Sequence, residues 1–101
     1  MKRILEALES TGLPVAYRAW PEGQAPPLPY LCYLEGNSDN FAADGKVYVK
    51  INWYRVELYT AKKDPETEAL VEKALDGFVW EKENTYIESE KCYQTTYEME
   101  D

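Results

Sequence analysis

VYVKINWYRVELYT at residues 47–60 runs almost directly into KKDPETEALVEKALDGF at residues 62–78, and these two segments decide the fold. The first is rich in β-branched and aromatic residues, a composition typical of a strand. In the second, Asp64 offers a side-chain acceptor to the first helical N–H groups, and Pro65 stands where no N–H is needed. The pattern predicts a helix from Asp64 to Asp76, packed on a mainly antiparallel sheet that contains the first segment.

Apolar spacing predicts which faces of these two elements are buried. In the helix, Leu70 and Leu75 belong to a set of residues three or four positions apart, which is typical of a single apolar face. In the strand, Val56 and Leu58 are two residues apart and therefore share a face. We expect all four side chains to lie in the core.

The alternation of apolar residues in the strand changes phase near Trp53 and Tyr54. Before this point the apolar residues occupy odd positions, and after it they occupy even ones, such as Val56 and Leu58. Because a slip of one residue turns every later side chain to the opposite face, the pattern predicts a β-bulge or bend here. One half of the strand can then leave the sheet core and meet a partner.

The rest of the chain contains short segments that fit one small domain. Two helices are expected, the first from Lys2 to Ser10, and a brief strand follows from Val15. The later features are a proline-rich loop at Pro21 to Pro29, a strand at Tyr30 to Glu35, an Asx-rich loop at Asn37 to Gly45 with Asp44-Gly45 as its tight turn, a strand from Phe78 with a turn at Lys82 to Asn84, and a last strand from Cys92 to Met99. This order predicts a single α+β domain over residues 1–101, a mainly antiparallel β-sheet with two helices packed on one side.

Charge and composition limit the possible partners. The chain has 19 acidic and 11 basic residues, a formal charge of −8. Affinity for nucleic acid depends on clustered Lys and Arg, so we expect no direct grip on nucleic acid and no binding to anionic membranes. No segment approaches the length of a signal-peptide core or a membrane span, which predicts an intracellular protein.

The residue types present also limit the chemistry. Histidine is absent, which excludes imidazole zinc sites, Ser-His and Cys-His nucleophile pairs and histidine acid-base catalysis. Cys32 and Cys92 form no CxxC pair, so we expect two packed, reduced thiols, with a disulfide or a reactive thiol as the alternative. A calcium loop starting at Asn37 would need oxygen ligands where Phe41 and Tyr48 stand. We predict no catalytic residue, no metal site and no cofactor.

Several segments resemble a family of small proteins encoded in the head-to-tail region of siphophages and prophages of Gram-positive bacteria. The likeness covers nearly the whole chain, in this order: LPVAY at Leu13 to Tyr17, NFAADGKVY at Asn40 to Tyr48, ELYT at Glu57 to Thr60 with KDP at Lys63 to Pro65, and YIESEK at Tyr86 to Lys91. The resemblance implies tail completion by a tail terminator or head-tail joining subunit. Such subunits form a ring, usually a hexamer, between the tail tube and the head connector. The implied partners are copies of the chain, the tail-tube protein and the head-connector proteins.

The resemblance implies no set of functional residues, so we choose contact candidates on physical grounds. Asn40, Phe41 and Asp44 in the Asx-rich loop are the candidates, with Phe41 as the apolar anchor. A loop that becomes ordered on binding must bury some area to offset its lost entropy. Three alternatives stay open: another neck or minor capsid protein, an acidic regulatory or inhibitory binding module, and a small enzyme or ligand-binding domain.

Overall fold

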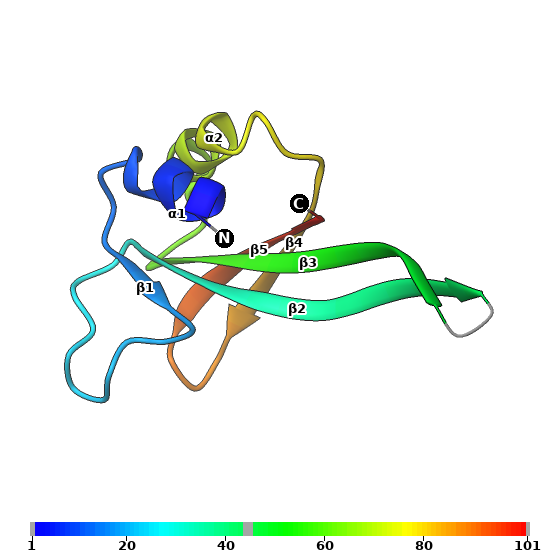
Figure 1. Cartoon of the computed structure of the whole chain (residues 1–101). Helices are drawn as coiled ribbons and strands as arrows, with labels where there is room; N and C mark the ends of the chain where they lie inside the picture. The colour runs from blue at the N-terminus through cyan, green and yellow to red at the C-terminus, as the bar shows by residue number, and fades with distance from the viewer. Residues whose placement is uncertain (1, 44–45, 101) are drawn as a thin grey trace.

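A computed structural model describes residues 2–43 and 46–100, with residues 2 and 37–52 described by their backbone alone (Figure 1). The elements in chain order are α1 Lys2–Glu9, β1 Val15–Tyr17, β2 Tyr30–Ala43, β3 Lys46–Thr60, α2 Pro65–Ala74, β4 Trp80–Ile87 and β5 Cys92–Glu100. The strands form one sheet in the order β1-β2-β3-β5-β4. β1 is parallel to β2, and the other neighbouring pairs are antiparallel.

Both helices lie on the same face of this sheet (Figure 1). Between the helices and the sheet is one hydrophobic core, whose fully buried members are Ile4, Leu8, Leu31, Val56, Leu58, Val71, Leu75, Tyr97 and Met99. Every element except β1 and β4 contributes to that list, so the core joins the two ends of the chain to its middle. The predicted α+β fold, a mainly antiparallel sheet with two helices on one side, is confirmed.

The start of α2 is fixed by its own first residues. The carboxylate of Asp64 accepts a hydrogen bond from the backbone N–H of Thr67 at 3.1 Å and another from its hydroxyl at 2.7 Å. Pro65 occupies the first helical position. These contacts satisfy N–H groups that have no partner inside the helix, as the sequence predicts.

The buried face of α2 differs from the predicted face at one position. Leu75 is fully buried, as expected, whereas Leu70 is 42% exposed. The buried residues within α2 are Glu68 and Val71, which stand three and four positions apart from each other and from Leu75. With 3.6 residues per turn, Leu70 points roughly 100° away from Val71. The prediction that Leu70 is buried is therefore wrong, and a carboxylate shares the buried face instead.

Two segments predicted as a loop or a turn belong to strands. Residues from Asn37 onward continue β2 as far as Ala43, and Lys82 to Asn84 lies in the middle of β4. Each segment is paired with a neighbouring strand, β2 with β3 and β4 with β5. Hydrogen bonding to these partners overrides the local preference of Asn, Asp and Gly for turns. The predicted tight turn at Asp44 and Gly45 lies outside the described residues.

The N-terminal part of the chain follows the predicted order. α1 buries Ile4 and Leu8 and ends in a turn where Gly12 has a φ of 81°. β1 is a brief strand, and the proline-rich segment from Pro21 to Pro29 has no regular element before β2 begins. Residues 18–29 therefore link two strands that lie side by side and run in the same direction.

Candidate functional site

β2 and β3 together extend past the rest of the sheet (Figure 1). β5 joins β3 from Trp53 onward, and β1 joins β2 as far as Tyr33. Beyond these points, in the described part of the chain, β2 and β3 pair with each other alone. We call this two-stranded extension, residues 36–43 and 46–52, the ribbon. It presents two backbone edges on which no other strand of the described chain lies.

A β-bulge lies where the ribbon leaves the sheet. The register between β2 and β3 shifts by one residue between Glu35 and Ser38, opposite Trp53. The predicted break near Trp53 is confirmed, but the extra residue belongs to β2 rather than to β3. Gly36 suits the bulge, because a Cβ there would stand only 3.3 Å from the Cβ of Trp53.

The predicted contact residues fall in the ribbon. Asn40 pairs with Lys50, and Phe41 pairs with Val49, so both belong to a strand and not to the predicted loop. A second register shift follows Phe41. Asp44 lies outside the described residues. That Asn40, Phe41 and Asp44 contact a partner stays a prediction.

A polar groove lies at the base of the ribbon, on the sheet face opposite the helices. Val56 and Leu58 face the helices, so Arg55 and Glu57 point to the other face by the alternation of a strand. Arg55 donates hydrogen bonds to Glu57 at 3.0 Å and to Glu98 at 3.4 Å. The groove has a volume of about 700 Å³, and its lining includes Arg18, Leu34, Trp53, Arg55, Glu81 and Glu98. Arg55 and Glu98 form an ion pair in this groove, and both side chains are partly exposed to solvent.

A second groove, of about 640 Å³, lies between the proline-rich segment and the sheet. Aromatic rings line it. The rings of Trp20 and Tyr30 meet edge-on with their centroids 5.9 Å apart, and the centroids of Tyr30 and Tyr59 are 5.3 Å apart. Both cysteines also line this groove. Burial raises the pKa of the Cys32 thiol to about 11 and raises that of Cys92 as well. Both thiols are therefore protonated at neutral pH and are poor nucleophiles.

Strand β3 lies between the strands that carry the two free cysteines. Cys32 lies on β2 and Cys92 lies on β5, with β3 between these strands. Neighbouring strands are about 4.8 Å apart, so the two backbones are separated by about 10 Å or more. A disulfide needs Cα atoms no more than about 7 Å apart. A bridge between the two cysteines would require the sheet to open.

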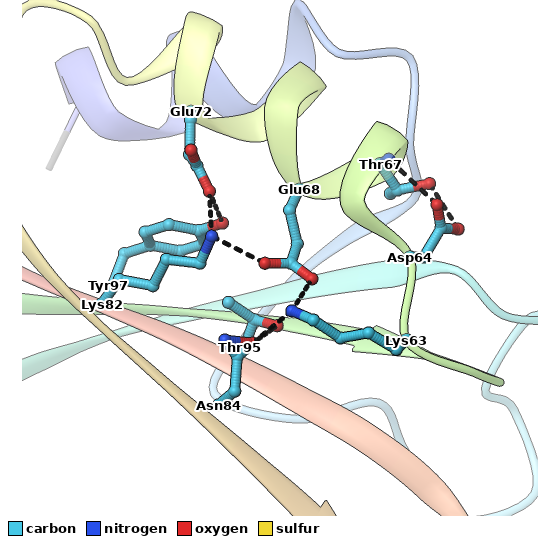
Figure 2. Close-up of polar contacts among 9 residues, drawn as sticks. All are labelled: Lys63, Asp64, Thr67, Glu68, Glu72, Lys82, Asn84, Thr95 and Tyr97. Atoms are coloured by element: carbon cyan, nitrogen blue, oxygen red, sulfur yellow. Dashed lines mark hydrogen bonds and ion pairs between the residues drawn. The ribbon is translucent and has the colours of Figure 1, made fainter.

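Figure 2 shows a polar network that joins α2 to β4 and β5. Glu68 is only 4% exposed and accepts hydrogen bonds from Lys63 and Lys82. The Nζ atom of Lys82 lies 2.7 Å from a carboxylate oxygen of Glu68 and 2.7 Å from one of Glu72. Glu72 also accepts a hydrogen bond of 2.8 Å from the hydroxyl of Tyr97. Lys63, Lys82 and Tyr97 are thus the donors to these two carboxylates.

The charges in this network reinforce one another. Burial opposes ionisation of Glu68, but its bonds to Lys63 and Lys82 outweigh that effect and lower its pKa. Burial likewise opposes the charged form of Lys82, and its bonds to Glu68 and Glu72 nevertheless raise its pKa. Burial and the bond to Glu72 raise the pKa of Tyr97. At neutral pH these groups keep their ordinary charge states, so the network fixes α2 on the sheet and does not supply a poised acid or base.

This network was not predicted from the sequence, although the sequence contains one signal for it. Glu68 stands three residues before Val71 and seven before Leu75, which places it on the apolar face of α2. A carboxylate on such a face requires a cationic partner from elsewhere in the fold. Lys82, fourteen residues further along the chain, is that partner.

No three side chains of the types that bind metals are grouped together in residues 2–43 and 46–100. None of the helices in those ranges is long and apolar enough to cross a bilayer. No model of a protein family and no curated protein matches the chain. The ribbon and the two grooves thus present backbone edges, aromatic rings and paired charges.

Proposed function

We propose that the chain is a non-enzymatic structural protein of a phage or prophage, a tail terminator or tail-completion subunit at the head-tail junction. The proposal starts from the sequence resemblance, and the observation that supports it best is the ribbon. The longest resembling segment, Asn40 to Tyr48, belongs to the ribbon in its described part. A subunit that assembles with copies of itself needs edges or loops that reach its neighbours, and the ribbon supplies such edges.

In this role the partners are copies of the chain, the tail-tube protein and the head-connector proteins. The copies form a ring, a hexamer according to the resemblance, on the end of the tail tube. The protein is in the host cytoplasm during assembly and at the head-tail junction of the finished virion. The helix-covered core then acts as the rigid body of each subunit, and the ribbon reaches away from it.

The formal charge of −8 suits a ring through which DNA passes. Acidic side chains on the inner wall repel the phosphates, so the duplex moves through without sticking. The same charge makes free subunits repel one another. We therefore expect a monomer in dilute solution, which closes into a ring on the tail-tube end, where further contacts and a high local concentration favour association.

Deletion of the gene tests the proposal. We expect electron micrographs of the lysate to show tails of irregular length or tails unattached to heads, and wild-type protein supplied in trans to restore normal virions. Phe41→Asp is expected to fail in the same assay, although the purified variant gives a native circular-dichroism spectrum. Leu70→Asp is the matched control, because it adds the same charge at an exposed apolar residue on α2 and is expected to restore virions.

The possible results distinguish the proposed function of the protein from the proposed contact role of Phe41. Normal virions after deletion of the gene would end the proposed function. A deletion defect that Phe41→Asp repairs fully would keep the role and remove Phe41 as the anchor. A deletion defect that Leu70→Asp also fails to repair would show that the assay responds to added charge in general.

A further inference from the structure

The two edges of the sheet differ in how well they are protected from further pairing. The β1 edge is three residues long and is followed by Arg18, whose φ of 66° turns the chain toward the proline-rich segment. Short strands and nearby prolines hinder the addition of another strand. β4 is eight residues long, has no proline, and pairs without a register shift from Trp80 to Ile87. On its other side, no strand of the described chain lies against it.

The side chains of β4 leave this edge open. A lysine on an edge strand normally deters pairing, but Lys82 is held back against α2 by Glu68 and Glu72. At the two ends of the strand, Val79 is 86% exposed and Tyr86 is 45% exposed. The edge therefore offers backbone donors and acceptors between two exposed apolar side chains.

Charge distinguishes this edge from the ribbon. Glu81 and Glu83 are exposed, and by alternation they lie on the face opposite Lys82. The β3 part of the ribbon, KVYVKIN at residues 46–52, contains Lys46 and Lys50 and no carboxylate. Its seven residues match the eight of β4 in length. A basic strand with an open edge and an acidic strand with an open edge are thus present in the same chain.

We propose that residues 46–52 of one copy pair along the β4 edge of a second copy, so that the sheet continues from subunit to subunit. Lys46 and Lys50 then lie near Glu81 and Glu83 of the neighbouring copy. Each subunit offers one ribbon and one edge, which makes the contact head-to-tail, and such contacts close into a ring when the rotation allows it. Closure into a ring rests on the proposed function, whereas the pairing of two copies does not.

Cross-linking of purified protein tests the pairing directly. One variant carries Lys50→Cys and another carries Glu83→Cys, and a flexible bismaleimide joins thiols in either register. We expect a covalent dimer when the two proteins are mixed at high concentration, and a ladder of larger species when one chain carries both changes. The natural Cys32 and Cys92 are buried with raised pKa values, so wild-type protein serves as the blank.

The matched control combines Lys50→Cys with Glu66→Cys, an exposed position on α2. A yield no higher than that control, at the highest soluble concentration, would overturn the proposal. A dimer formed equally well by Lys50→Cys alone would also overturn it, because that result indicates ribbon-to-ribbon pairing.

Charge reversal then tests the proposed proximity of the lysines to Glu81 and Glu83. We expect Lys46→Glu in the Lys50→Cys protein to lower the yield severalfold, and Glu81→Lys in the Glu83→Cys partner to restore it. If Lys46→Glu lowers the cross-linking yield and Glu81→Lys does not restore it, the proposed pairing of these charges is wrong. None of these results depends on virion assembly, so a failure here leaves the role at the head-tail junction to be judged by the gene deletion.

Discussion

β2 and β3 are a single pair of strands with two different surroundings. From Tyr54 to Thr60, β3 lies between β2 and β5 under the two helices, where Val56 and Leu58 are fully buried. In the ribbon, the same strands extend beyond β5 and beyond the helices (Figure 1). Burial of apolar side chains stabilises the first half, whereas the described backbone of the second half is paired in a ladder of two strands.

An isolated two-stranded ladder is marginally stable in water. The ribbon therefore depends on its attachment to the core in the free protein, and it gains most from a partner that covers it or pairs with its edges. Four measurements test how far the two halves of the strand pair differ in stability.

Hydrogen exchange should show the largest difference between the two halves. We expect amides of β3 from Tyr54 to Thr60 to exchange only on global unfolding, which for a domain of this size has a free energy of about 5–15 kcal/mol. Amides of residues 46–52 should exchange through local opening, several kcal/mol lower. The measurement is residue-resolved exchange by NMR. Equal protection in both halves would show that the ribbon belongs to the cooperative core.

Truncation in the core should have the next largest effect. Leu75→Ala removes a fully buried side chain and should lower the free energy of unfolding by about 2–5 kcal/mol. Val49→Ala in the ribbon should lower it by less than about 1 kcal/mol. Urea denaturation of both variants gives the comparison. The contrast between the halves would fail if Val49→Ala were as damaging as Leu75→Ala.

Glu68→Gln should have a smaller effect that depends on pH. It weakens the bonds to Lys63 and Lys82, for an expected loss of about 1–3 kcal/mol at neutral pH. Because the pKa of Glu68 is lowered in the folded protein, its contribution is present above the unfolded value of about 4.3 and is lost as the pH falls through the folded value. Urea denaturation at several pH values should therefore show a shallower acid limb for the variant. An unchanged limb would contradict a lowered pKa for Glu68 in the folded protein.

Leu70→Ala should have the smallest effect. The side chain is 42% exposed and lies outside the buried face of α2, so the free energy of unfolding should change by no more than about 0.5 kcal/mol. Urea denaturation beside Leu75→Ala checks this. A loss of unfolding free energy comparable to that of Leu75→Ala would indicate that Leu70 lies on the buried face, as the sequence predicts.

Features that depend on neighbouring residues in the sequence were predictable. Asp64, Pro65 and Thr67 specify the start of α2 within four residues, and the structure has the expected cap. The change of phase near Trp53 also marked the right position in β3. One strand alone, however, does not reveal which partner holds the extra residue, and here the bulge is on β2 at Gly36.

Features that depend on distant residues could not be predicted in this way. Glu68 is buried because Lys82 of another element neutralises it, and Leu70 is exposed as a result of the same rotation of the helix. Asn40 and Phe41 are in a strand because β3 pairs with them, which outweighs the turn preference of the surrounding Asn and Asp residues. The sequence thus located these candidate residues but not the element that holds them.

The bulge at Gly36 divides β2 into two stretches whose residues meet different structural constraints. Residues before it must fit the packed interior of this chain, whereas residues after it are constrained mainly by whatever molecule they meet. Substitutions beyond the bulge can therefore accumulate without loss of the folded state. Descendants of this chain that keep the same docking partner would be expected to retain the segment from Asn40 to Tyr48, and those that exchange the partner would be expected to change it while the scaffold under the helices stays the same.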